Sequence, residues 1–277
     1  MDEQIERINA LAKKMRISAI EMGHAAGRKG AHFGGGLSCI EILACLYGGI
    51  MNIDPHNPTR DNRDVFILSK AHGVLALYTA LAHTGFFPLD DLNTFERNES
   101  ELSGHPVMNI ERGIEISGGS LGMGFSQGVG IALGCRRRHF DNHVFVLLGD
   151  GECDEGSNWE AAMAAAHFKL DSLIVIVDNN KLQYDGRPAE VMNLLSLEDK
   201  FLSFGFDVRE VDGHDTTSLS NALRSATNDR NQKPKAIIAD TVKGKGVSFM
   251  ENQPAWHHGV LSEKQYQQAM SEVEGSL

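Results

Sequence analysis

The chain has 277 residues, of which 42% are hydrophobic and 23% are charged, a composition typical of a folded globular protein with a full core. Its formal net charge of −11 argues against a nucleic-acid-binding surface and against an anionic membrane as partners. The four cysteines have no CxxC spacing, so we predict free thiols in a reducing compartment. The polar start of the chain and the lack of an apolar run of membrane-spanning length predict a soluble, cytoplasmic protein without a signal peptide.

The amino-terminal part of the chain is predicted to be helical with one glycine-rich interruption. Apolar side chains at helical spacing predict a long amphipathic helix over residues 3–26. Residues 29–36 contain three consecutive glycines and one histidine, His32, and are expected to form a loop. Ser38 and Glu41 then fit a capping box ahead of an apolar helix.

Loops in the next part of the chain carry histidine or glycine at positions suited to ligand binding. A strand is predicted within residues 62–69, and His72 follows its end directly, ahead of a helix. His105 lies in a second loop, whose backbone is stiffened by the following proline. The glycine-rich segment 116–124 leads into a helix with small residues on one face. These small residues permit either close helix packing or contact between the loop backbone and a ligand.

A strand–helix–strand unit follows. Residues 144–148 and 173–177 are apolar runs rich in valine and isoleucine and bounded by turn residues, which is typical of buried parallel strands. Residues 157–168 between them have a helix-forming composition. The first strand leads into a Gly-Asp-Gly motif and the second into Asp-Asn-Asn. Both motifs therefore lie at the carboxyl ends of neighbouring strands, where open α/β sheets bind ligands.

The carboxyl-terminal part adds further elements of the same kind. They are helices over residues 194–204, 217–227 and 262–273 and strands over residues 206–211 and 236–240. No internal repeat, low-complexity tract or convincing linker interrupts the sequence. We therefore predict a single domain over residues 1–277, with an α/β fold in which helices flank a central, mostly parallel sheet.

The two strand-end motifs supply oxygen atoms of the kind that a divalent cation prefers. Asp150 provides a carboxylate, Asn180 an amide, and the backbone just beyond Asn180 a carbonyl, and two diphosphate oxygens with water complete six ligands. Gly149 and Gly151 let backbone N–H groups approach a diphosphate, whose charge the following helix start favours. A plain tight turn is one competing interpretation. A Rossmann dinucleotide site is another, but Asp154 stands where its third glycine is required.

These motifs also carry a family resemblance. Gly149-Asp150-Gly151, followed after 27 intervening residues by Asn179-Asn180, resembles the thiamine-diphosphate motif, and the surrounding segments resemble the transketolase family. The resemblance covers nearly the whole chain, but it corresponds only to the amino-terminal, diphosphate-binding (PP) domain of that family. It implies the thiamine-diphosphate-binding fold.

The resemblance implies roles for individual residues. Those implied to bind the cation are Asp150, Asn180 and the backbone carbonyl of Leu182. Those implied to bind the cofactor are His72, Gly119, Ser120, Leu121, Gly149, Asp150, Gly151, Glu155, Asn180, His257 and His258. Those implied to be catalytic are His32, His72, His105, His257 and Glu160. Glu155 and Glu160 correspond to glutamates in polar contacts and proton relay between subunits, and His257 matches the diphosphate-side histidine better than the adjacent His258.

The activity that the resemblance implies is the transfer of a two-carbon ketol unit from a ketose to an aldose, with thiamine diphosphate and Mg²⁺ (or Ca²⁺ or Mn²⁺) as cofactors. The family's pyrimidine-binding and carboxyl-terminal domains have no counterpart in these 277 residues. We therefore expect them on a partner subunit, in a heterotetramer that acts on sugar phosphates of the pentose phosphate type. The alternatives are a 1-deoxyxylulose-phosphate synthase-like enzyme, a 2-oxo-acid dehydrogenase α-type subunit, a non-catalytic thiamine-diphosphate-binding paralogue and a nicotinamide oxidoreductase.

Overall fold

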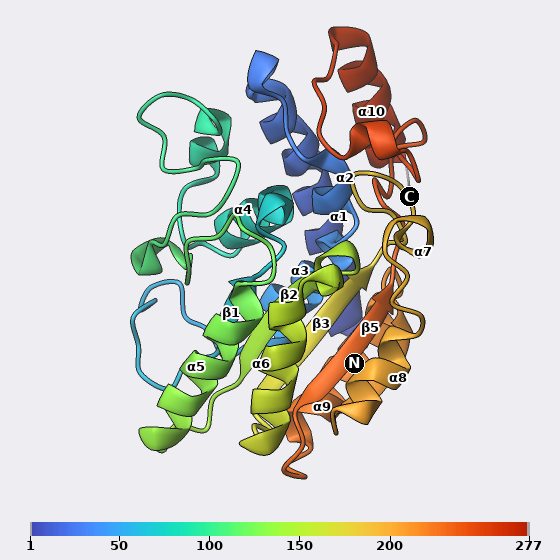
Figure 1. The fold of residues 1–277 in the computed structure, drawn as a ribbon. Helices are drawn as coiled ribbons and strands as arrows, with labels where there is room; N and C mark the ends of the chain where they lie inside the picture. Colours follow the sequence, from blue (N-terminus) through green and yellow to red (C-terminus); the bar gives the residue numbers. More distant parts are fainter. Residues whose placement is uncertain (1, 276–277) are drawn as a thin grey trace.

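A computed structural model describes residues 2–275 and contains a five-stranded sheet in which every pairing is parallel (Figure 1). The strand order is β1-β2-β3-β5-β4. The strands are β1 (Val65–Leu68), β2 (Val144–Gly149), β3 (Leu173–Asn179), β4 (Asp207–Asp212) and β5 (Lys235–Asp240). The predicted α/β fold with a mostly parallel central sheet is thereby confirmed.

Alternate side chains of the central strands enter two separate hydrophobic cores. In β2, Phe145 and Leu147 belong to the core on one face of the sheet, and Val144, Val146 and Leu148 belong to the core on the other. Successive side chains of a strand point to opposite faces, so a strand that is covered on both faces needs an uninterrupted apolar run. This is why these segments show no polar alternation.

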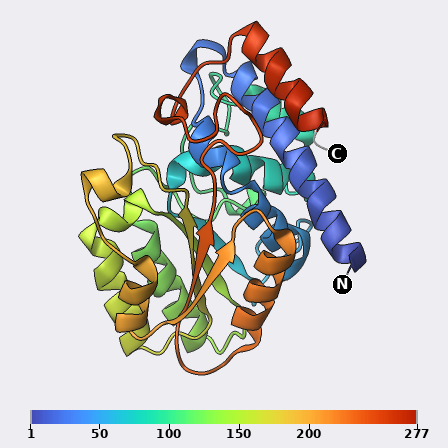
Figure 2. The ribbon, with the colours of Figure 1, turned by 90° about the vertical axis from the view of Figure 1, so that its right-hand side faces the viewer.

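Helices cover both faces of the sheet (Figure 1). One core is closed by α1 (Asp2–Ala25), α2 (Phe33–Leu37), α3 (Ile40–Cys45), α4 (Val74–His83), α9 (Thr216–Asn228) and α10 (Glu263–Gly275). The other is closed by α5 (Gly124–Arg137), α6 (Gly156–His167) and α8 (Leu197–Ser203). Figure 2 shows α1 and α10 side by side, outside the layer that covers the first face. A short helix, α7 (Pro188–Val191), lies in the loop after β3.

The structure differs from the prediction within residues 29–46. The expected loop contains α2, whose phenylalanine and leucine are fully buried. The predicted capping box is wrong, because Cys39 precedes α3 and no side chain caps that helix. Ser38 is fully buried, and its hydroxyl donates to the Asp178 carboxylate at 2.6 Å, so it does not act with Glu41 as a cap.

The other predicted helices and strands begin and end within a few residues of the expected positions. All four cysteines are free, as predicted. Among residues 2–275 no helix combines the length and the apolar character needed to cross a bilayer.

Candidate functional site

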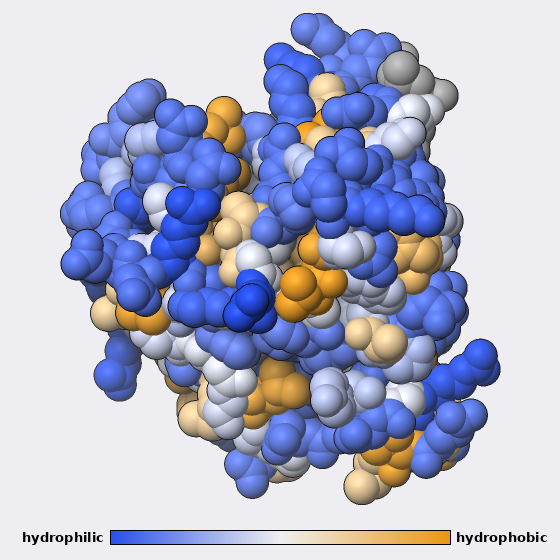
Figure 3. Space-filling model, turned by 90° about the horizontal axis from the view of Figure 1, so that it is seen from above, coloured by the Kyte–Doolittle hydropathy of each residue, from blue (hydrophilic) through white to orange (hydrophobic). Residues whose placement is uncertain are grey.

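Four strands of the sheet end at one edge, and each delivers polar side chains to it. β1 is followed by Lys70 and His72, β2 by Asp150, β3 by Asn180 and β5 by Lys243. All five side chains line one cavity of about 200 Å³. Figure 3 looks down on this edge and shows a hollow between two lobes of the molecule, with hydrophobic residues inside a mostly hydrophilic surround. The predicted convergence of the two motifs is correct, because β2 and β3 are neighbours.

Asp150 is buried at this edge and connects the loops after β2 and β3. Its Oδ1 accepts from the Gly151 N–H at 2.8 Å, and its Oδ2 accepts from the Lys181 N–H. Burial raises the pKa of Asp150 to about 6, and the nearby Asp178 carboxylate adds to this effect. An adjacent cation would oppose both causes and favour the ionised carboxylate. The environment of Asp150 is therefore one that a bound cation would complete.

Gly151 allows the two loops to approach each other. A Cβ atom at this position would lie 2.7 Å from the Cβ of Gln183, which is closer than the packing of carbon atoms permits. A side chain here would push the loop after β2 away from the loop after β3. The motif thus needs glycine for the spacing between its loops as well as for access to the backbone.

The carbonyl oxygen of Leu182 is directed at a positive charge. It accepts from the Lys243 ammonium at 2.7 Å, and the same ammonium lies 3.2 Å from the carbonyl oxygen of Gln183 and 3.1 Å from Nδ1 of His257. Burial lowers the pKa of Lys243 to about 8, with Lys70 as the next cause. A cationic group thus contacts the carbonyl that was predicted to bind a metal ion.

The donor atoms fit a hard divalent cation. Asp150, Asn180 and Leu182 would supply one carboxylate, one amide and one carbonyl, all of them oxygen ligands. The amide oxygen of Asn180 accepts from the Leu182 N–H at 3.2 Å and keeps a second lone pair. Among residues 2–275 there is no cluster of three or more His, Cys, Asp or Glu side chains arranged to hold an ion. The set therefore fits Mg²⁺ or Ca²⁺ better than a zinc site of nitrogen and sulfur ligands.

A buried ion pair that sequence analysis did not identify supports the same edge. Lys70 is 1% exposed and pairs with Asp178, which is 0% exposed. The Asp178 carboxylate also accepts from the hydroxyls of Ser38 and Thr241 and from the Asn180 amide. Burial would raise the pKa of Asp178, but Lys70 outweighs it and the pKa is lowered. A charged residue at the end of an apolar strand was the available signal, because such a residue needs a buried partner.

Glu152 is a further residue that the sequence did not single out. It is 2% exposed, and its carboxylate accepts from the Ser69 hydroxyl, from the Gly122 N–H at 2.9 Å and from the Gly149 N–H at 3.1 Å. These bonds connect the ends of β1 and β2 to the glycine-rich segment 116–124. Leaving such donors unpaired would cost free energy, so Glu152 fixes this segment beside the cavity.

Five histidines gather around the mouth of the cavity. The ring centroids of His258, His105, His257 and His72 lie 4.6, 5.5, 5.5 and 5.6 Å from that of His32. Burial lowers the pKa of His32 to about 4 and that of His257 to about 3, and it places the pKa of His72 well below the usual value. These three imidazoles are neutral at pH 7, so each offers one hydrogen-bond donor and one acceptor.

The two adjacent histidines face different parts of the site. His257 lines the cavity and stacks on His72, with ring centroids 5.1 Å apart. His258 is exposed, does not line the cavity and packs edge-on against His32. Of the two, His257 has the geometry of a diphosphate-side residue.

The remaining candidate residues lie at the rim or outside the cavity. Leu121 lines it, whereas Gly119 and Ser120 are exposed beside it. Glu155 directly precedes α6 and Glu160 lies within that helix, and both are exposed and away from the cavity lining. Any role for these two glutamates therefore involves groups outside the cavity.

The chain matches a family model and several relatives along almost its whole length. The model, described as the thiamine diphosphate binding domain of transketolase, matches residues 8–274. One of the two subunits named for apulose-4-phosphate transketolase, from Phocaeicola vulgatus, is 42% identical over 270 residues, which cover 98% of this chain and 95% of the relative. A subunit of 6-deoxy-6-sulfo-D-fructose transketolase from Clostridium sp. is 45% identical over 243 residues, or 88% of each chain.

Longer proteins match over the same region. Human transketolase is 34% identical over 275 residues, which cover 98% of this chain and 42% of the human protein. The crystal structure of Pichia stipitis transketolase in complex with sedoheptulose 7-phosphate has a TM-score of 0.89 at 26% identity and covers 98% of this chain and 41% of its own. Transketolase from Leishmania mexicana has a TM-score of 0.87 at 28% identity, with 96% and 41% covered.

The fold, the strand-end site and the matching model define a thiamine diphosphate binding domain. The relatives narrow this class. The chain belongs to the transketolase family, and it corresponds to the amino-terminal, thiamine-diphosphate-binding part of that family. The predicted family, fold and transferase class are confirmed.

Proposed function

We propose that the chain is the diphosphate-binding subunit of a split transketolase. Together with its partner it transfers a two-carbon ketol unit from a ketose phosphate to an aldose phosphate. Its cofactors are thiamine diphosphate and a divalent cation, Mg²⁺ being the ion that suits a diphosphate best. We also propose that the enzyme acts in the cytoplasm, where its free cysteines stay reduced.

One observation carries this proposal, which is the convergence of oxygen donors and positive charge at the carboxyl ends of β2, β3 and β5. Asp150, Asn180 and the Leu182 carbonyl are assigned to the cation. Lys243 and His257, which are 3.1 Å apart through Nζ and Nδ1, are assigned to the diphosphate. A diphosphate and its cation would then satisfy both sets of charges in one cavity.

The histidines supply proton transfer and substrate positioning. When bound, thiamine diphosphate supplies the carbanion chemistry that breaks and forms the carbon–carbon bond. His32, His72 and His105 are assigned to the sugar hydroxyls, because neutral imidazoles can both donate and accept protons near pH 7. The backbone of Gly119, Ser120 and Leu121 is assigned to the cofactor ring, at the rim of the cavity.

The partner subunit is assigned the pyrimidine-binding half of the site. The names of the two bacterial relatives, each of which is called a subunit, support an enzyme made of two kinds of chain, and a symmetric heterotetramer is the default arrangement. The exposed Glu155 and Glu160 are assigned to contacts between subunits and to proton relay.

The substrate is proposed to be a sugar with an anionic end group. The bacterial relatives are named for apulose 4-phosphate and for 6-deoxy-6-sulfo-D-fructose. These two ketoses carry a phosphate and a sulfonate, respectively, so an anionic group is the feature that they share.

The proposal is tested by purifying the chain with the product of an adjacent reading frame that encodes a pyrimidine-binding domain. Ketol transfer from a ketose phosphate is then assayed for each of the two chains and for the mixture. We expect activity only in the mixture, and only with thiamine diphosphate and Mg²⁺. Full activity of the purified chain alone would contradict the split arrangement, and turnover of pyruvate in place of the ketose phosphate would favour a synthase-like or dehydrogenase-like enzyme.

A further inference from the structure

Lys243, which the proposed function assigns to the diphosphate, lies on a short segment whose backbone is held at three successive points. The Val242 N–H donates to Nε2 of His214 at 2.8 Å. The Gly244 N–H donates to the Gly34 carbonyl at 3.0 Å. The Lys245 carbonyl accepts from Nε of Arg16 at 3.0 Å. The residues on both sides of Lys243 are therefore fixed by groups from other parts of the chain.

Two of these groups meet at one buried carboxylate. Glu41 accepts from Arg16 at 2.7 Å through Oε1 and from His214 at 3.0 Å through Oε2. The side chains of Arg16, Glu41 and His214 are 11%, 11% and 14% exposed. Burial would raise the pKa of Glu41, but Arg16 and His214 outweigh it and the pKa is lowered. The carboxylate thus stays charged and joins α1, α3 and the turn before α9.

The bonding pattern fixes the form of the imidazole. Nε2 of His214 accepts the Val242 N–H, so the ring proton is on Nδ1, which donates to Glu41. A neutral histidine of this tautomer can hold the carboxylate and the backbone at once. The third member, Arg16, likewise bridges Glu41 and the Lys245 carbonyl through different nitrogens.

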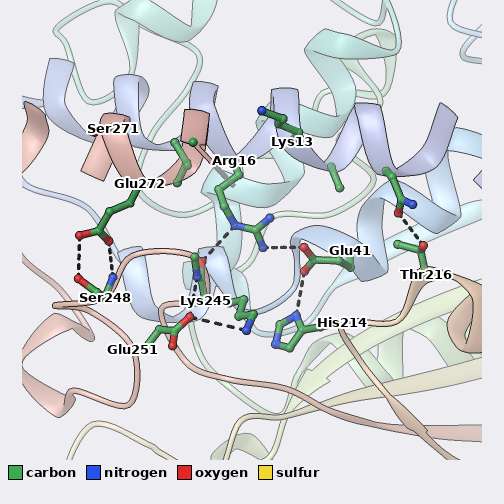
Figure 4. Close-up of a pocket in the computed structure, with 15 residues that line it drawn as sticks. Lys13, Arg16, Glu41, His214, Thr216, Lys245, Ser248, Glu251, Ser271 and Glu272 are labelled. Atoms are coloured by element: carbon green, nitrogen blue, oxygen red, sulfur yellow. Dashed lines mark hydrogen bonds and ion pairs between the residues drawn. The ribbon is translucent and has the colours of Figure 1, made fainter. Parts of the chain in front are cut away.

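Packing around the segment leaves little room for adjustment. Gly246 has a φ of +92°, and a Cβ there would lie 2.7 Å from Cδ of Arg16. Figure 4 shows Arg16, Glu41, His214 and Lys245 along one wall of a cavity of about 950 Å³, bounded by α1 and α10. This cavity is distinct from the one at the strand ends, and the segment 242–246 runs between them.

We propose that Arg16, Glu41 and His214 form a positioning network that holds the Lys243 ammonium in the cofactor cavity. The inference rests on the proposed function, since it needs the cofactor to occupy that cavity. Residues that orient a binding group through a second layer of hydrogen bonds change affinity without touching the ligand. Loosening the network therefore weakens cofactor binding, while the reacting groups remain in place.

The test uses Glu41→Gln and Arg16→Lys in the complex of both subunits. Glutamine cannot accept from both donors through two oxygens, and lysine cannot bridge the carboxylate and the Lys245 carbonyl as a fork does. We expect the Kd of thiamine diphosphate at fixed Mg²⁺ to rise roughly tenfold. The kcat at saturating cofactor is expected to stay within about twofold of the wild type, because the loss is one of uniform binding.

A matched control separates positioning from general stability. Arg63→Lys disrupts a comparable pair with Glu115, whose side chains are 14% and 10% exposed, at the opposite end of the sheet. This control is expected to lose stability in urea without a change in Kd. Equal Kd values for Glu41→Gln, Arg16→Lys and wild type would show that the network is structural only and would overturn the inference.

A double-mutant cycle tests whether the network acts through Lys243. In a Lys243→Met background, Glu41→Gln is expected to have little further effect on the cofactor Kd, because the group that it positions is gone. Additive losses would overturn the inference. If the wild-type complex fails to bind thiamine diphosphate, the proposed function itself fails and the inference fails with it, which is a different outcome from wild-type binding with unaffected variants.

Discussion

The buried ion pair between Lys70 and Asp178 gives the sharpest prediction about stability. The perturbation is Asp178→Asn, which keeps the size of the side chain and removes its charge. In the wild type the carboxylate accepts from Lys70, Ser38, Thr241 and Asn180. An asparagine in its place has one acceptor oxygen, and its NH₂ group then faces a former donor.

The magnitude follows from burial. Lys70 is 1% exposed, and without the carboxylate its ammonium keeps the Gly35 carbonyl, at 2.8 Å, as an acceptor. Removing one partner of such a pair leaves an uncompensated buried charge, which costs about 3–5 kcal/mol. For a protein of this size a loss of that order lowers Tm by roughly 10 °C. The pKa of Lys70, which Asp178 raises against the effect of burial, should fall in the variant.

The assay is urea unfolding followed by circular dichroism, with tryptophan fluorescence as a second probe. The control is Asp240→Asn, which removes an exposed pair with Lys181 whose side chains are 55% and 64% exposed. Exposed pairs of this kind contribute about 0–1 kcal/mol. Because Asp240 ends the strand that neighbours the strand of Asp178, the two variants change the same residue type at the same edge.

A free energy of unfolding for Asp178→Asn that matches that of Asp240→Asn would refute this reasoning. It would mean that the Lys70 amine gives up its proton or finds another partner at little cost. Coincident transitions from the two probes are required, since a separate loss of the site edge would produce two steps.

Three further predictions concern the site. Gly151→Ala places a Cβ 2.7 Å from that of Gln183, so we expect a loss of about 1–3 kcal/mol in urea unfolding, whereas Gly156→Ala, with no atom within 4 Å of its Cβ, should be neutral, and equal values would contradict the packing argument. The pKa of His32 is lowered to about 4 in the folded chain, so the unfolded state binds its proton first and stability should fall as pH drops from about 6.5 to about 4, a decline that Tm measurements should find reduced in His32→Gln. Removing the divalent cation with EDTA should weaken thiamine diphosphate binding by at least roughly tenfold in calorimetry, and Asp150→Ala should do the same at saturating Mg²⁺; unchanged affinity in either case would argue against the proposed ligand set.

The sequence alone determined the strand–helix–strand unit and the polar motifs at its ends. Apolar runs and the turn residues that bound them are local signals, and parallel neighbouring strands must bring their carboxyl ends to one edge. Asp150 and Asn180 could therefore be placed together without coordinates. The resemblance carried by the same motifs also indicated the family, which the matching family model confirmed.

Only the tertiary structure decided which distant groups complete the site. Lys70 and Asp178 are 108 positions apart, and their contact depends on the order of the strands and on the direction of two side chains, which no local pattern encodes. The capping box failed for the same reason, because burial of Ser38 against Asp178 outweighed its local preference for a helix start. His257 was separated from His258, and Lys243 was found at the predicted metal-binding carbonyl, only when packing fixed where each side chain points.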